Sequence, residues 1–68
     1  MIVTLNGEDV RLPDDATVAE AVAASGAPEP YRGVAVAVDG EVVPRGEWET
    51  TTLRPGQRVE VLQAVQGG

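Results

Sequence analysis

Two dipeptides, Asn6-Gly7 and Asp39-Gly40, constrain the fold of this 68-residue chain most strongly. A two-residue type I′ turn needs positive φ at both central positions, which Asn, Asp and Gly tolerate better than other residues. Val-rich segments flank both dipeptides, and β-branched side chains fit a pleated sheet. The sequence therefore predicts two β-hairpins, with strands at residues 2–5 and 9–12 in the first and at 34–38 and 41–43 in the second.

Alternation of apolar residues predicts which side of each strand faces the core. In the first hairpin the inward set is Val3, Leu5, Val10 and Leu12. A turn at Pro55-Gly56 precedes a fifth strand over residues 58–62, in which Val59 and Val61 point inward. Glu60 and Leu62 should then point outward, so Leu62 is expected to be an exposed apolar side chain.

One helix is predicted between the hairpins. Thr17 and Glu20 have the spacing of a capping box, in which each side chain can bond to the other residue's backbone N–H. The helix is expected over residues 18–25, with Val18, Ala21, Val22 and Ser25 on its buried face and Gly26 after its end. Residues 44–52 are predicted to be irregular with a short helical turn, and Leu53 is a lone apolar anchor.

The order of hairpin, helix, hairpin and strand predicts an α+β fold. A right-handed crossover after the first hairpin lays the helix across one face of a single mixed sheet of about five strands. The last strand then takes the central position beside the first, which is the β-grasp arrangement of ubiquitin-like proteins. We expect one domain over residues 1–63 and a flexible C-terminal tail over residues 64–68.

The composition excludes several functional classes. Five Arg stand against eleven Asp and Glu, giving a net charge of −6, which argues against binding nucleic acid or an anionic membrane surface. Cys and His are absent, which excludes disulfides, Cys/His metal sites, a Cys nucleophile and a His general base. We therefore expect no enzyme activity, no bound cofactor and no metal, and a cytoplasmic location.

The sharpest functional signal is Gly67-Gly68 at the end of the chain. One interpretation is a frayed terminus without function. The other interpretation is a terminus that reacts. A carboxylate is a poor electrophile, so the terminal carboxylate would first have to be activated at a nucleotide site of another protein. Glycine has no Cβ, so a tail that ends in Gly67-Gly68 could thread a narrow channel to such a site, with Gln66 entering behind the two glycines.

The C-terminal third carries a family resemblance. Four segments resemble the ThiS family of thiamine-biosynthesis sulfur carriers: Val43-Pro44-Arg45-Gly46-Glu47-Trp48, Thr51-Thr52-Leu53, Pro55-Gly56-Gln57-Arg58-Val59-Glu60-Val61 and Ala64-Val65-Gln66-Gly67-Gly68. The short first strand, the Asn-Gly turn and the Thr-Val helix opening are also similar, so the resemblance covers essentially the whole chain. Gln57 departs from the family, which usually has Asp there.

The resemblance implies a function at Gly68. An E1-like adenylyltransferase would adenylate its carboxylate with ATP-Mg, and sulfur from a persulfide relay would convert it to a thiocarboxylate. Thiazole synthase would use that sulfur to build the thiazole moiety of thiamine. The alternatives are a molybdopterin-type or other ubiquitin-like sulfur carrier, or a ubiquitin-like binding module with an inert tail.

Four further residues remain open at this stage. Leu62 is a candidate docking anchor for a partner protein. Arg54 and Arg58, close to the tail in the sequence, either contact the partner or balance Glu60. Trp48 either stacks on a ligand or covers the small core beside the stem of Arg45.

Overall fold

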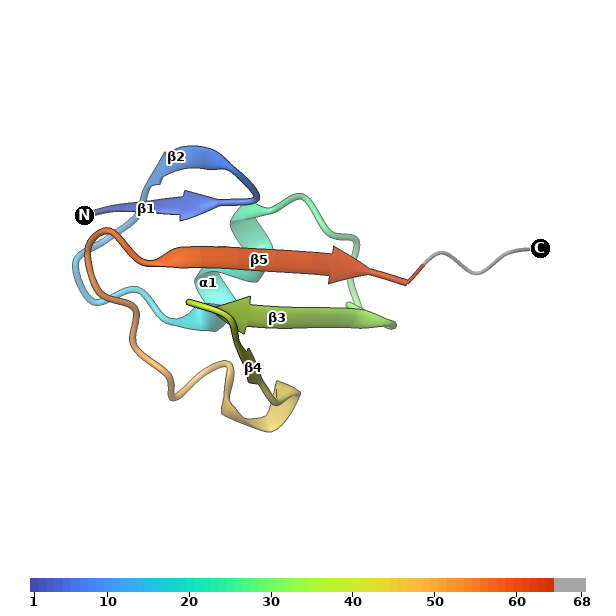
Figure 1. The fold of residues 1–68 in the computed structure, drawn as a ribbon. Coiled ribbons are helices and arrows are strands. Elements are labelled where there is room, and N and C mark those ends of the chain that lie inside the picture. The colour runs from blue at the N-terminus through green and yellow to red at the C-terminus, as the bar shows by residue number, and fades with distance from the viewer. Residues whose placement is uncertain (65–68) are drawn as a thin grey trace.

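Both predicted hairpins form around positive-φ turns, with φ of 50° and 84° at Asn6-Gly7 and of 49° and 85° at Asp39-Gly40. The computed structural model describes residues 1–64 (Figure 1). Its elements are β1 (Ile2–Leu5), β2 (Glu8–Arg11), α1 (Val18–Ala24), β3 (Val34–Val38), β4 (Glu41–Val43), the 3₁₀ turn η1 (Arg45–Glu47) and β5 (Arg58–Gln63).

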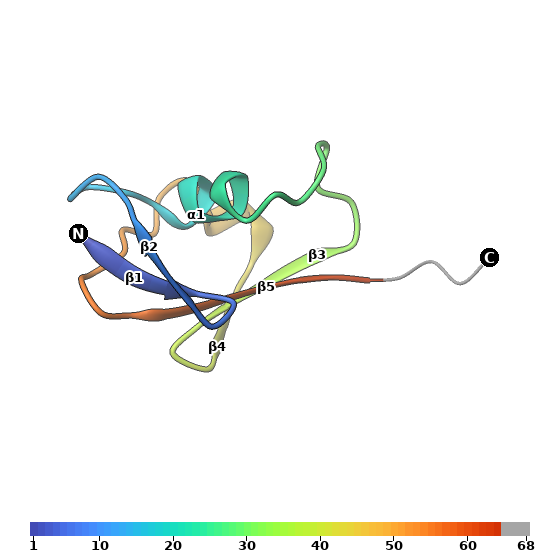
Figure 2. The ribbon, with the colours of Figure 1, turned by 90° about the horizontal axis from the view of Figure 1, so that it is seen from above.

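The strands form one mixed sheet in the order β2-β1-β5-β3-β4. The last strand, β5, lies in the centre, parallel to β1 and antiparallel to β3. Helix α1 covers one face of this sheet, as the view from above shows (Figure 2). The predicted α+β fold of the ubiquitin-like β-grasp type is therefore confirmed.

Helix α1 begins and ends as the sequence predicts. Thr17 has extended backbone angles at the N-cap, and its N–H donates to the Glu20 carboxylate at 3.4 Å, the half of the capping box that Glu20 supplies. Ser25 is the C-cap and Gly26 follows with φ of 83°, a conformation that favours glycine. The completely buried residues Val18, Ala21 and Val22 face the sheet. Their small side chains let the helix lie close to it.

The core lies between α1 and the sheet and is closed by Trp48 and Leu53. Val59 and Val61 of β5 point into it, and Leu62 points away with 64% of its surface exposed, so the predicted register of β5 is confirmed. Val10 and Ser25, both expected in the core, are only half-buried because β2 is an edge strand and Ser25 lies at the helix end. Within residues 1–64, no helix is long and apolar enough to cross a membrane.

Candidate functional site

The C-terminal end of β5 brings the chain to one edge of the domain. The Ala64 N–H donates to the Gly33 carbonyl at 2.9 Å, so pairing with the β3 side continues one residue past the strand. Gly33 has φ of 70°, a backbone conformation that favours glycine, and it lies beside Ala64. The predicted reacting residue Gly68 and the predicted threading residues Gln66 and Gly67 lie outside the described residues.

On its other edge, the end of β5 is held by a side chain. Asn6 Oδ1 accepts a hydrogen bond from the Val61 N–H at 2.8 Å, and Asn6 Nδ2 donates to the Val61 carbonyl at 3.2 Å. Sequence reasoning identified Asn6 only as a turn residue. Its contact with Val61 spans 55 positions of the chain, so no local signal could have revealed it.

The sheet face opposite α1 carries a group of apolar side chains, which we call the outer patch: Ala35, Ala37, Val42 and Leu62, with Glu60 opposite Ala37. Leu62 lies directly opposite Ala35, and Val42 lies directly opposite Ala37. Val42 is 74% exposed, more than Leu62. The predicted exposure of Leu62 is thus confirmed, and the patch adds three residues that the sequence analysis missed. Exposed apolar patches of this kind are typical of protein interaction sites.

The two candidate arginines lie at the other end of β5. Arg58 is the first residue of the strand and Arg54 precedes it, whereas the tail follows Gln63 (Figure 1). The strand rises about 3.3 Å per residue, which separates Arg58 from Gln63 by roughly 17 Å. Proximity in the sequence was therefore misleading. The Arg58 guanidinium is 4.0 Å from the Glu60 carboxylate, a distance that supports the charge-balancing alternative, and both side chains are about half exposed or more.

A polar network surrounds the start of β5. Asp39 accepts hydrogen bonds from the Arg58 N–H at 2.9 Å and from Gln57 Nε2 at 3.1 Å. Gln57 in turn accepts from the Arg54 N–H at 2.8 Å. Gln57, the departure from the family pattern, thus ties the Pro55-Gly56 turn to the second hairpin. The Arg58 N–H, followed by Gln57, lowers the pKa of Asp39 below its ordinary value of 3.8.

This shift makes a prediction about acid stability. A carboxyl whose pKa is lower in the folded state stabilises the fold above its unfolded pKa, and this contribution is lost as the pH falls through the folded value. We expect Asp39→Asn to flatten the fall in unfolding free energy below about pH 4, because Asn keeps the turn and an acceptor oxygen but does not titrate there. Urea unfolding across this pH range tests this, and an unchanged slope would contradict it.

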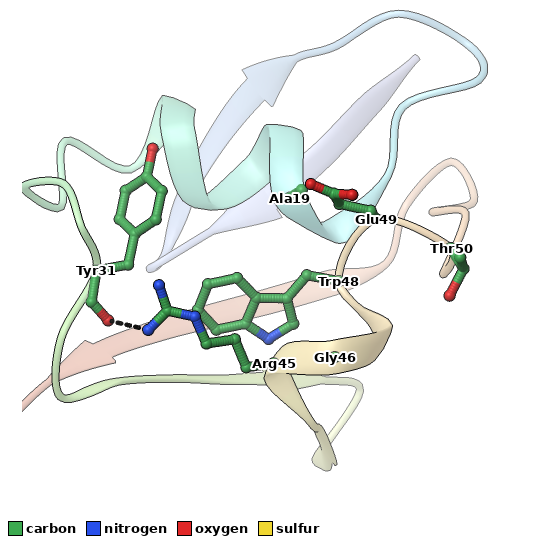
Figure 3. Close-up of a pocket in the computed structure, with 7 residues that line it drawn as sticks. All are labelled: Ala19, Tyr31, Arg45, Gly46, Trp48, Glu49 and Thr50. Atoms are coloured by element: carbon green, nitrogen blue, oxygen red, sulfur yellow. Dashed lines mark hydrogen bonds between the residues drawn. The ribbon is translucent and has the colours of Figure 1, made fainter.

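Trp48 belongs to the core. It is 5% exposed, and its Nε1 donates to the Val43 carbonyl at 3.0 Å. The Arg45 guanidinium lies over its ring, 5.5 Å from the centroid, and Tyr31 meets the ring edge-on at 6.3 Å (Figure 3). Arg45 also donates to the carbonyls of Pro30 and Tyr31. These contacts favour the core role of Trp48 over the ligand-stacking alternative.

A hollow of about 310 Å³ lies beside this cluster, between α1 and η1. Its walls include Ala19, Tyr31, Arg45 and Glu49. Arg45 donates hydrogen bonds from its guanidinium to the backbone carbonyls of Pro30 and Tyr31. It therefore connects the loop before β3 to the segment after β4. Among residues 1–64, no group of three or more potential metal ligands comes together.

Comparison with known proteins gives one consistent result. A model of the ThiS family matches residues 2–68. The crystal structure of a thiamine biosynthesis protein (ThiS) from Geobacter metallireducens is 30% identical, with complete coverage of both chains and a TM-score of 0.79. The NMR solution structure of a thiamine biosynthesis protein from the same organism is 31% identical over all of this chain and 88% of that one, with a TM-score of 0.78. No curated protein sequence matches the chain.

Proposed function

This chain belongs to the ThiS family, and from that premise we propose that it is a sulfur carrier in thiamine biosynthesis that reacts at the Gly68 carboxylate. The observation that supports this most strongly is that the family match includes Gly67-Gly68, the residues expected to react and to thread the channel. The carrier is a co-substrate of its partners rather than an enzyme.

The proposed chemistry has three steps at the C-terminus. A Gly68 carboxylate oxygen attacks the α-phosphorus of ATP-Mg on an E1-like adenylyltransferase, and pyrophosphate leaves. The terminal sulfur of a relay persulfide then displaces AMP from the acyl carbon and gives an acyl disulfide, which a thiol reduces: the thiolate bonds to the relay sulfur, and the terminus leaves as a thiocarboxylate. Thiazole synthase is the proposed acceptor of this sulfur.

The outer patch supports the proposal of a docking surface for the adenylyltransferase. The outer patch lies on the sheet face that α1 leaves uncovered. Leu62 belongs to this patch and is two residues before Ala64, whose N–H donates to the Gly33 carbonyl. We propose that the adenylyltransferase docks on this patch and receives the tail beside it. Arg54 and Arg58, at the far end of β5, are proposed only as contacts at the margin of this surface.

Intact-mass measurement tests the proposal. After incubation with ATP-Mg, the adenylyltransferase, the sulfur donor and a thiol, we expect the chain to gain the mass difference of one sulfur replacing one oxygen. A reaction without ATP is the control and should leave the mass unchanged. No mass change under the complete conditions, with an adenylyltransferase that is active on another carrier, would contradict the proposal.

The sulfur acceptor distinguishes the two carrier pathways. Thiocarboxylated chain should support thiazole formation when mixed with thiazole synthase and its other substrates. A carrier that supplies only the sulfur of molybdopterin would give no thiazole here. That result would replace the thiamine assignment with the alternative pathway.

A further inference from the structure

We propose that Asn6 is a positioning residue for the reacting terminus. Its side chain would hold the end of β5 from the side opposite β3 and so set the direction in which the chain leaves the sheet. This inference rests on the proposed function, because it concerns how the Gly68 carboxylate is delivered to a partner.

Backbone pairing between β1 and β5 stops early. It consists of Thr4 opposite Arg58 and Leu5 opposite Val59, and the Asn6 N–H adds a bond to the Val59 carbonyl at 2.9 Å. The chain then turns away at Asn6-Gly7. Without a further partner on this side, β5 would change after Val59 from a central strand into a strand bonded along one edge only.

The Asn6 carboxamide continues the pairing by one residue. A carboxamide carries the same donor and acceptor as a peptide group. Here the acceptor meets the Val61 N–H at 2.8 Å and the donor meets the Val61 carbonyl at 3.2 Å, so both polar groups of one β5 residue are satisfied. The side chain thus replaces the backbone that β1 no longer supplies.

Bonds on both edges restrict the strand in a way that bonds on one edge do not. The β3 side is bonded through Ala64, and a strand bonded on that side alone can pivot about the line of those bonds. The Asn6 bonds to Val61 remove this freedom. Rotation about that edge would turn the last peptide groups of the strand out of the plane of the sheet, and would so change the orientation in which the chain continues past Ala64.

The orientation of the strand end matters for the reaction. Misplacing a reacting atom by about 1 Å can reduce the rate on the order of a hundredfold. Binding in the partner's channel would correct part of this change in orientation. The strand end would then be held away from its preferred direction, which costs free energy on the way to the reaction. We therefore expect loss of the Asn6 bonds to lower kcat for adenylation, whereas KM stays nearly unchanged because the Asn6 side chain bonds to the Val61 backbone and not to the side chains of the outer patch.

The second hairpin provides a matched control. Asp39 is also the first residue of a two-residue turn, with φ of 49°, and its side chain also bonds to β5, through the Arg58 N–H. It does so at the start of the strand, away from the tail. Asn6→Gly and Asp39→Gly each keep a residue that accepts positive φ. Asn6→Gly removes two side-chain bonds to β5, and Asp39→Gly removes one bond to β5 and one to Gln57.

ATP–pyrophosphate exchange with the adenylyltransferase tests the proposal. We expect Asn6→Gly to lower kcat about tenfold with KM within about twofold, a fraction of the loss that full misplacement would cause. Asp39→Gly should leave both parameters within about twofold of wild type. Asn6→Asp, which keeps the acceptor for the Val61 N–H but loses the donor, should give an intermediate kcat and remains informative if Asn6→Gly unfolds.

Amide hydrogen exchange gives a readout independent of the partner. Asn6→Gly should accelerate exchange of the Val61 N–H, and Asp39→Gly should not. Accelerated exchange at Val61 with wild-type kcat would overturn the positioning role and leave Asn6 a structural residue. Wild-type chain that shows no pyrophosphate exchange at all would instead overturn the proposed function on which this inference rests.

Discussion

Deletion of Gly67 and Gly68 is expected to abolish ATP–pyrophosphate exchange and to leave thermal unfolding nearly unchanged. The buried core is built from residues between Val3 and Val61, and glycine brings no side chain to it. Changes away from the core usually alter stability by less than about 0.5 kcal/mol. The shortened chain would still dock, but its carboxylate would end short of the α-phosphate.

A second variant distinguishes the effect of tail length from the effect of geometry at the reacting carbon. Gly68→Ala keeps the length and the carboxylate and adds a Cβ next to the reacting carbon, so we expect impaired rather than abolished exchange. Thermal melts of both variants serve as the control for folding. Exchange that persists in the deletion variant would rule out a reacting terminus and favour a binding module with an inert tail.

Substituting aspartate at two neighbouring positions of β5 should give opposite results. Val61 is 8% exposed and points into the core, so Val61→Asp would bury an unpaired carboxylate, at a cost of several kcal/mol. A domain of this size has little stability to spare, and we expect the variant to be unfolded. Far-UV circular dichroism measures this directly.

Leu62→Asp should fold normally and bind the adenylyltransferase poorly. Leu62 is 64% exposed in the outer patch, so the change places a charge in water in the free protein but against apolar surface in the proposed complex. We expect at least a tenfold weaker affinity by calorimetry, which corresponds to about 1.4 kcal/mol. Unchanged affinity would remove the outer patch as the docking surface, and equal loss of stability in both variants would contradict the register of β5.

Most of the fold could be predicted because its signals are local. The turn residues Asn6-Gly7 and Asp39-Gly40 report on their own φ preferences, and alternation along β5 reports on which face each side chain takes. The predicted strand and helix ends match the observed ones or differ from them by one residue, as at Gln63, which extends β5 beyond the predicted Leu62. The central position of β5 followed from the order of elements and the handedness of the crossover.

What the sequence determined by itself is therefore the set of elements, their inward faces and the terminal Gly-Gly. Only the tertiary structure decided which residues meet across the sheet. Asn6 and Val61 are 55 positions apart, and Val42 joins Leu62 in the outer patch only through β3 between them. Arg58 and Gln63 show the converse: they are only five positions apart in the sequence, but the extended strand places them roughly 17 Å apart. Local propensities act over a few residues, whereas pairing across a sheet is settled by how the whole chain closes its core.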